Sequence, residues 1–457
     1  MNENNKILNE YRRESLSSTN QTVITKIYEQ IDCEAFQQLL IQESVEIKRK
    51  KIIIDRDVQI QQVLKLNGIE SIIQFKGGSL VFEGTTIDSI FDEECYIQGF
   101  QIDVCQNTPC IRVHYRNLMI MACSIENFQN RGVFIKFDNS LIINDTILNG
   151  FSVLVCCEGN GKKLSINHSI IQSDYQQQQQ SILIHADNLG EFGLDITNSI
   201  IEGSSIIVTN SNNVEVKIQD NEFKNQQISI SFENVQNKSI IIEKNIFFRS
   251  MDYAIKMNNI VVDKLQLIKN TISKCRIGLF LQNVIEFCPL IKHIKPICLK
   301  QNVMTNMEQT AIIIREVICM EIDEINIQDN TIGMDIDIST SKMSEQIPIN
   351  PFIISIKNST ISSNRIHGIF INSNLSYNPI NLQISKSAFY SNCNALNLSH
   401  QGEPHDRIFK VNINNSQFQD NNFSNSNSNY ELNIINTNIV INKQLYFNSR
   451  SKTCQIM

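Results

Sequence analysis

Three neighbouring stretches of the sequence decide the fold: residues 216–223 read VKIQDNEF, residues 240–247 read IIIEKNIF and residues 265–272 read LQLIKNTI. In each stretch aliphatic residues occupy the first and third positions, asparagine the sixth and an apolar residue the eighth. The alternation at the start predicts a short strand with one buried face. The two-residue step before the asparagine predicts a corner, after which the amide and the last apolar side chain again point inward.

The same pattern, often with Ser or Thr in place of the asparagine, recurs along most of the chain. Its other copies begin at Leu80, Cys95, Leu118, Leu141, Leu164, Leu194, Ile297, Ile325, Ile354, Leu382 and Val411. A second alternating stretch, such as residues 206–208 or 369–371, follows most copies. Repeats of this length are typical of solenoids, in which a unit buries its apolar face only against its neighbours. Without intervening helices, the strands must stack in parallel, so we predict an all-β parallel β-helix of about 13–14 coils.

Over roughly residues 75–445 the repeat resembles the pectin-lyase-like family of right-handed parallel β-helices. The resemblance implies the right hand of the coil, which the pattern alone does not give. It also raises the question of polysaccharide cleavage, for which members of the family carry paired carboxylates or a carboxylate cluster with a basic residue. The nearest fragments here, such as Ile366-His367-Gly368 and Arg276-Ile277-Gly278, each lack the group that would act. We therefore interpret the chain as a divergent, non-catalytic member.

The pattern divides the chain into four parts. Residues 1–21 are predicted to be a disordered N-terminus, and residues 22–60 an amphipathic helix (Thr22 to Leu40) with an entry strand that caps the solenoid. The β-helix itself is predicted over residues 61–445. Residues 446–457 are predicted to be a flexible tail.

Composition limits the partners and the compartment. The formal net charge is −7, which argues against nucleic-acid binding. No signal peptide or transmembrane stretch is expected, and the 13 cysteines, irregularly spaced, are interpreted as reduced thiols of a cytoplasmic protein. The sequence predicts no cofactor and no metal.

The last four residues, Cys454-Gln455-Ile456-Met457, fit the C-a-a-X prenylation pattern, and the terminal Met points to a farnesyl group. Cys454 is therefore the predicted lipidation site. One farnesyl chain gives weak membrane binding, so we expect reversible, peripheral association with the cytosolic face of a membrane.

Two groups of titratable residues are the candidates for chemistry. Asp335 and Asp337 alternate outward on one predicted strand, with Arg315 one coil away, as either a cation site or a solvated ion pair. The densest group lies in one predicted loop, where it suits metal binding or acid–base chemistry but also a plain turn. It consists of His400, Glu403, His405, Asp406 and Arg407.

An outward column of largely apolar residues on the second strands is the predicted partner-binding face, because an exposed apolar column of this length is unusual in a monomer. It comprises Phe134, Leu154, Leu183, Ile207, Phe280, Ile313 and Phe370. The leading prediction is a non-enzymatic, prenylated scaffold that binds a protein partner. The alternative is a carbohydrate-binding or polysaccharide-cleaving β-helix.

Overall fold

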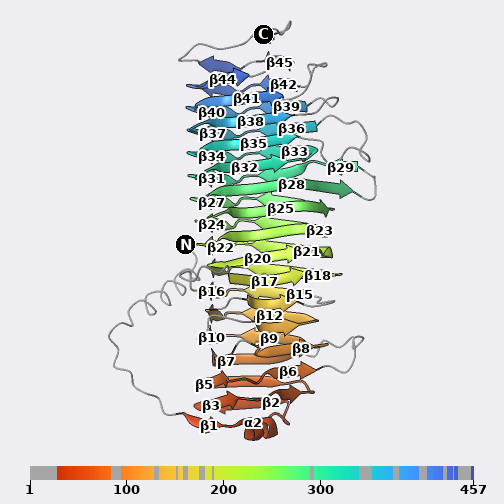
Figure 1. Ribbon diagram of the computed structural model, residues 1–457, viewed down its shortest axis with the longest axis vertical. Helices are drawn as coiled ribbons and strands as arrows, with labels where there is room; N and C mark the ends of the chain where they lie inside the picture. The colour runs from red at the N-terminus through yellow and green to blue at the C-terminus, as the bar shows by residue number, and fades with distance from the viewer. Residues whose placement is uncertain are drawn as a thin grey trace, which may run out of the picture.

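The structure, a computed structural model, describes residues 28–83, 94–106, 108–127, 133–150, 153–157, 163–173, 181–187, 190–288, 293–338, 352–373, 380–400, 409–425, 430–435, 437–440 and 454–456. This part of the chain is a parallel β-helix whose strands stack along one long axis (Figure 1). Each coil passes through three strand-bearing sides, named faces A, B and C in chain order. The first corner joins faces A and B, and the second corner joins faces B and C.

Face A is formed by β2 (Ser44–Lys48), β9 (Asn117–Met121), β12 (Ser140–Asn144), β15 (Lys163–Asn167), β18 (Phe192–Thr197), β21 (Asn212–Gln219), β26 (Leu265–Ile268), β30 (Ile297–Lys300), β33 (Cys319–Asp323), β36 (Phe352–Lys357), β39 (Ile380–Ser385), β42 (Phe409–Asn414), β45 (Tyr430–Ile435) and β47 (Cys454–Ile456). Face B is formed by β1 (Glu29–Ile31), β3 (Lys50–Ile54), β10 (Ser124–Asn127), β13 (Ile147–Asn149), β16 (Ile170–Gln172), β19 (Ile200–Glu202), β22 (Glu222–Lys224), β24 (Ile246–Phe248), β27 (Thr271–Ser273), β31 (Val303–Thr305), β34 (Asn326–Gln328), β37 (Thr360–Ser362), β40 (Ala388–Tyr390), β43 (Gln417–Gln419) and β46 (Asn438–Val440).

Face C is formed by β4 (Val58–Ile60), β6 (Leu80–Glu83), β8 (Ile111–His114), β11 (Val133–Phe137), β14 (Val153–Cys157), β17 (Ser181–Asp187), β20 (Ser204–Thr209), β25 (Tyr253–Val262), β28 (Ile277–Cys288), β32 (Thr310–Arg315), β35 (Ile332–Ile338), β38 (His367–Ser373), β41 (Asn394–His400) and β44 (Asn422–Asn425). Three long strands continue from one face to the next: β5 (Lys65–Phe75), β7 (Glu94–Val104) and β23 (Ile228–Glu243). The short β29 (His293–Lys295) pairs antiparallel with the end of β28.

The stacked coils bury the aliphatic residues of the repeat in one continuous core. Val216, Ile240 and Leu265 pair in register on face A and are at most 1% exposed. Successive coils are one strand spacing apart, about 4.8 Å. The predicted parallel β-helix is therefore confirmed, and its apolar column is the main source of stability, at roughly 1.5–3 kcal/mol for each large side chain removed from water.

One copy of the repeat lies in a different register from the predicted one. The pattern beginning at Ile325 was expected to align with the copy at Ile297, but the structure pairs Ile297 with Met320 and Leu299 with Ile322. Ile325 therefore occupies the first corner, and Asn330 lies at the second. The segment from Met320 contains aliphatic residues at the spacing required by both alignments, and the actual one buries Met320 as well as Ile322.

Buried asparagines form ladders at both corners. At the first corner the backbone N–H of Asn221 donates to Oδ1 of Asn245, and the pattern repeats to Asn270 and Asn302, each at 3.0 Å. The ladder ends there because the next corner residue is Ile325. A second ladder then runs along the second corner through Asn330, Asn364, Asn392 and Asn421, at 2.9–3.3 Å. The amides satisfy backbone groups that a tight corner removes from the strand ladder.

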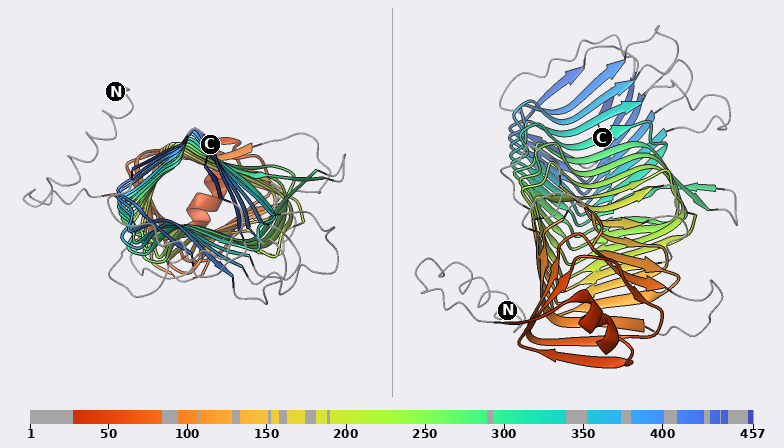
Figure 2. Two further views of the ribbon diagram at one scale, coloured as in Figure 1. Left: turned by 90° about the horizontal axis from the view of Figure 1, so that it is seen from above. Right: turned by 60° about the horizontal axis from the view of Figure 1, so that its bottom comes forward.

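A short helix, α2 (Cys33–Leu39), covers the N-terminal end of the core. Asp32 caps it by accepting a hydrogen bond from the Ala35 backbone N–H at 2.8 Å. Phe36 is fully buried against the first coils, and Figure 2 shows the helix lying across the opening of the solenoid. The cap is thus a helix as predicted, but the helix is shorter. Residues 29–31 form strand β1, which pairs with β3, while residues 22–27 lie outside the described residues.

The described C-terminal residues also belong to the solenoid. Leu432, Asn433 and Ile434 of β45 pair in parallel with Cys454, Gln455 and Ile456 of β47. The tail predicted to be flexible thus contributes a strand to the last coil. Within the described ranges, the structure contains no helix with the length and hydropathy required to span a membrane.

Candidate functional site

Outward side chains on face C form a straight column through the middle and upper coils. The strand register places Ile207, Ser231, Lys256, Phe280, Ile313, Asp335, Phe370 and Asn397 one above another. Four residues of the predicted partner-binding face, Ile207, Phe280, Ile313 and Phe370, lie in this column and are half-buried. Leu154 and Leu183 belong to β14 and β17, but their side chains lie outside the described part of the structure.

Phe134 was expected on the same face but is a core residue, with 1% of its surface exposed. The reason is that face C strands begin with two consecutive buried residues, such as Ala311 and Ile312, before the alternation starts. Phe134 precedes Ile135 as Ala311 precedes Ile312, and therefore lies inside. In later coils this position requires small residues, since a Cβ on Gly333 would lie 2.4 Å from the carbonyl oxygen of Gly368.

An ion-paired group interrupts the apolar column. The Arg315 guanidinium donates to both carboxylate oxygens of Asp335, at 2.6 and 3.3 Å. Its Nε lies 3.9 Å from Oδ2 of Asp337. Asp335 and Asp337 lie two residues apart on β35 and so project from the same side of the strand. The structure thus brings together the three residues that the sequence predicted as a group.

An aromatic pair lies directly beside this ion pair. Phe370 of β38 pairs in register with Asp335. His367 and Phe370 are stacked, with ring centroids 5.3 Å apart and planes 18° apart. The intervening Gly368 and Ile369 are both buried, and this local irregularity turns His367 and Phe370 to the same outer side. Sequence reasoning missed the pair because strict alternation would separate residues 367 and 370 onto opposite faces; the glycine at 368 was the available signal.

Amide side chains complete the group. Asn394 Nδ2 and Asn397 Nδ2 lie 3.3 and 3.5 Å from the two ring nitrogens of His367. Asn372 Nδ2 donates to Asp337 at 3.5 Å, and Asn372 Oδ1 is buried without a hydrogen-bond donor among the described residues. We call Arg315, Asp335, Asp337, His367, Phe370 and Asn372 the face C patch.

The environment shifts the protonation of two groups in the face C patch in opposite directions. Burial raises the pKa of Asp337, against the opposing attraction of Arg315, and the nearby Asp335 and Glu316 raise it further. Burial lowers the pKa of His367, so that its ring is neutral at pH 7. A carboxyl group that holds its proton more readily than usual, beside a carboxylate committed to an ion pair, is an arrangement suited to acid–base chemistry.

A second aromatic contact lies lower on the same face. Tyr253 and Phe280 meet edge to face, with ring centroids 5.3 Å apart. Lys256, which pairs with Phe280 in the column, lies 3.8 Å from Glu233. Face C therefore presents aromatic rings at two levels, with polar side chains beside each of them.

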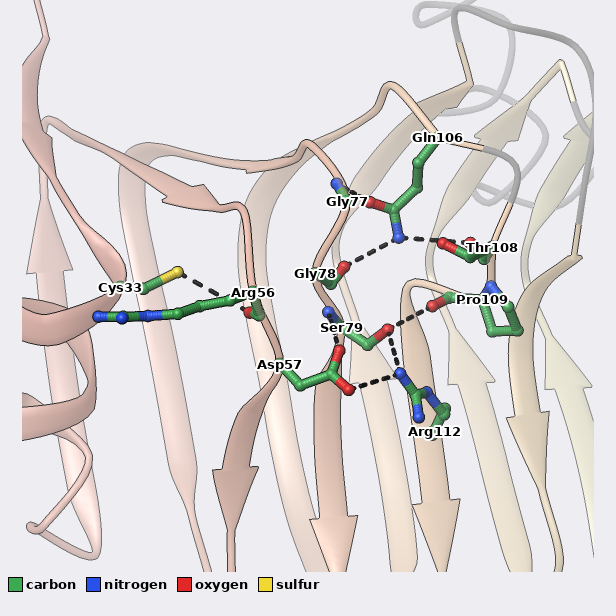
Figure 3. A network of polar contacts seen from close by, with 10 residues as sticks. All are labelled: Cys33, Arg56, Asp57, Gly77, Gly78, Ser79, Gln106, Thr108, Pro109 and Arg112. Atoms are coloured by element: carbon green, nitrogen blue, oxygen red, sulfur yellow. Dashed lines mark hydrogen bonds and ion pairs between the residues drawn. The ribbon is translucent and has the colours of Figure 1, made fainter.

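Another polar network lies near the N-terminal end and is structural (Figure 3). Arg112 bridges Asp57 and Ser79 at 2.8 and 3.1 Å. The buried Gln106 amide accepts a hydrogen bond from Gly77 N–H and donates to the carbonyl of Gly78 at 2.8 Å (Figure 3). These contacts join three successive coils, so the network holds the first coils of the stack together.

The other predicted site cannot be assembled from the described residues. His400 ends strand β41, but its side chain, like Glu403, His405, Asp406 and Arg407, lies outside them. Among the described residues, no three His, Cys, Asp or Glu side chains are placed to bind a metal ion together.

Comparisons with known proteins give only remote structural likenesses. No family model matches the sequence, and no curated protein sequence matches it. A periplasmic alginate epimerase, AlgG, matches 76% of this chain and 78% of its own with a TM-score of 0.36 and 11% identity. The catalytic domain of a GH87 α-1,3-glucanase matches 93% of this chain and 67% of its own, with a TM-score of 0.30 and 10% identity. Endopolygalacturonase I from Stereum purpureum matches 92% of this chain and 100% of its own, with a TM-score of 0.22 and 11% identity.

These likenesses concern the fold alone. The described part of the chain is a right-handed parallel β-helix, as predicted. The prediction of a non-enzymatic, prenylated scaffold, however, is wrong. The solved structures named above are enzymes by their titles. Prenylation of Cys454 has no support, and Cys454 lies in strand β47 instead of a free tail.

Proposed function

We propose that this protein binds a polysaccharide along face C and acts on it at the face C patch. The observation that carries the proposal is the ion pair of Arg315 with Asp335 and Asp337, placed against the His367–Phe370 stack. Sugar rings offer apolar C–H faces and a rim of hydroxyl groups. They are bound by aromatic rings next to carboxylate, amide and guanidinium groups, which both give and accept hydrogen bonds.

The repeat of the coil suits a polymer. Outward residues on face C recur at one strand spacing, about 4.8 Å, which is close to the length of one sugar unit in an extended chain. A polysaccharide lying parallel to the solenoid axis would place successive sugars over Phe280, Ile313, Asp335 and Phe370 in turn. The solved enzymes named above act on alginate, α-1,3-glucan or polygalacturonate by their titles, which agrees with this class of ligand.

Binding is tested by affinity electrophoresis in gels that contain a panel of soluble polysaccharides. At least one polysaccharide should retard the wild-type protein. Phe370→Ala and Arg315→Ala should each weaken binding by about tenfold, or ~1.4 kcal/mol. Phe248→Ala and Arg49→Ala are matched controls, because Phe248 lies outward on face B and Arg49 pairs with Glu70 far from the face C patch. Retardation by no polysaccharide, or equal loss in the controls, contradicts the proposal.

Cleavage of the bound chain is the chemistry that the paired carboxylates favour. Residues two apart on a strand are separated by about 6.6 Å along the backbone, a spacing of the same order as the ~6.5–9.5 Å between the carboxyl groups of inverting glycosidases. Asp337, whose pKa is raised, would protonate the leaving oxygen, and Asp335 would activate water.

A reducing-end assay on the bound polysaccharide tests this step. Asp337→Asn should reduce product formation by at least ~100-fold, while Asp323→Asn, a carboxylate on face A that pairs with Lys300, should not. Binding without any release of reducing ends would leave a carbohydrate-binding protein and remove hydrolysis.

A further inference from the structure

We infer that the polysaccharide taken by the face C patch is neutral, built from sugars without carboxylate, sulfate or amino groups. This inference rests on the proposed function and adds the substrate class. It follows from the charges of the face C patch, from the partners already held by its one guanidinium, and from the hydrogen-bond acceptors that it leaves open.

The charge around the face C patch disfavours an acidic polymer. Asp335 and Glu316 contribute two carboxylates and Asp337 a third when it is ionised, and the cations on the same strands and the adjoining corner are Arg315 and Arg365. His367 adds no charge at pH 7, because burial lowers its pKa. A uronic acid or sulfate ester bound here would therefore lie beside carboxylates, with no surplus of positive charge to offset its own.

Arg315 is not free to offset that charge. Its two terminal nitrogens donate to Asp335, and one also donates to the Asp335 carbonyl at 3.2 Å, while its Nε faces Asp337. Recognition of an acidic sugar would require the guanidinium to exchange a carboxylate of the protein for one of the ligand. Lys256, three coils below Asp335, is similarly engaged with Glu233.

The groups that remain open are acceptors. Asn372 Oδ1 is buried and has no donor among the described residues. Asn258 Oδ1, four coils below Asn372 in the row that also contains Arg315 and Asp337, has none either. Hydroxyl groups of a neutral sugar are donors that suit these oxygens and those of Asp335 and Asp337. Phe370 and Phe280 add apolar surface for the sugar rings. A chain rich in hydroxyl groups and without charge thus meets each feature of the patch.

Isothermal titration with three oligosaccharides of equal length tests the inference: a neutral gluco-oligosaccharide, an oligo-uronate and an oligomer of deacetylated amino sugar. The neutral chain should bind at least tenfold more tightly than the oligo-uronate, with little dependence on salt. Equal or tighter binding of the oligo-uronate, or tightest binding of the amino-sugar oligomer, overturns the inference while leaving the proposed function intact. Binding of none of the three, together with no retardation by any polysaccharide, overturns both.

A charge-removing variant gives a second readout. Asp335→Asn frees Arg315 from its carboxylate partner and should shift the affinity ratio towards the oligo-uronate by at least fivefold. Asp337→Asn, which leaves the Arg315–Asp335 pair in place, should shift it in the same direction by less. Asp323→Asn on face A should leave the ratio unchanged. A ratio that is the same in all four proteins would show that these carboxylates do not exclude acidic sugars.

Discussion

At the scale of single residues, buried amide side chains provide the hydrogen bonds that the polar groups at each corner need. Asn270 Oδ1 accepts from the backbone N–H and from Nδ2 of Asn245, and its own Nδ2 donates to the carbonyl of Ile242 at 2.8 Å. Removal of the amide would leave the buried backbone N–H of Asn245 without its acceptor, and would take one partner each from Asn245 Nδ2 and the Ile242 carbonyl. Serine performs part of this role elsewhere, since the Ser169 N–H donates to Oγ of Ser199.

Replacement of Asn270 by leucine should therefore lower the free energy of unfolding by about 2–5 kcal/mol, because each buried polar group left unpaired costs roughly 1–3 kcal/mol. Asn270→Ser, which retains an acceptor, should cost less than half as much. Chemical denaturation followed by far-ultraviolet circular dichroism measures both. Equal losses for the two variants would show that packing volume, and not the hydrogen-bond ladder, is what matters at this corner.

His367 should make stability depend on pH in mildly acidic solution. Burial lowers its pKa below the value of 6.5 that it has when unfolded, so between the two values the unfolded chain binds more protons than the folded one. The stability associated with the neutral ring is thus complete above pH 6.5 and is lost as pH falls through the pKa of the folded state. His367→Gln should flatten this part of the profile, as measured by midpoints of urea unfolding between pH 7.5 and 5. An unchanged slope would place the pH dependence at another group.

At the level of elements, the N-terminal helix and the first coils act as one unit. Phe36 of α2 is fully buried, and Cys33 Sγ of the same helix lies 3.2 Å from the carbonyl oxygen of Ile53 in β3. The network around Gln106 and Arg112 then joins β4, β6 and β8 on the adjoining face, at the start of the stack (Figure 3). The cap thus protects strand edges and core that would otherwise meet water.

Phe36→Ala should destabilise this end of the molecule by about 3–5 kcal/mol, through loss of buried surface and formation of a cavity. The loss should be local. Hydrogen exchange read by mass spectrometry should increase in β3 and β4 and remain unchanged in β36 to β42. Leu39→Ala, at an exposed position of the same helix, is the control. Uniform acceleration along the whole chain would contradict the local role of the cap.

The architecture of the whole molecule could be predicted from alternating aliphatic residues, because a strand with one buried face is recognisable from that alternation alone. The details that failed lie where two alignments bury similar side chains, as at Met320 and Ile325, or where a strand begins with consecutive buried residues, as at Phe134. Asp335, Asp337 and Arg315 could be placed together from the same alternation. The His367–Phe370 stack could not, because it depends on the irregular backbone at Gly368.

A solenoid of equivalent coils should tolerate the loss of one. Ile246 pairs with Thr271 and Phe247 with Ile272, so deletion of residues 246–270 joins Asn245 to Thr271 at matching positions of neighbouring coils. The shortened protein should fold, with a similar circular dichroism spectrum per residue and a rod shorter by about one strand spacing, ~4.8 Å. Small-angle scattering would measure the length. A chain that no longer unfolds cooperatively would show that the coils are not interchangeable.

Helix α2 at the base of the stack has a consequence for biosynthesis. Each coil pairs with the coil before it, so in a nascent chain leaving the ribosome each new coil can form its strand pairs on the coil already folded. Helix α2, which covers this end of the core, emerges before the coils that stack on it, so no later segment is needed to begin the process. We therefore expect the polypeptide to wind up stepwise during translation, so that arrest-peptide measurements of pulling force would show recurrent peaks at intervals of one coil.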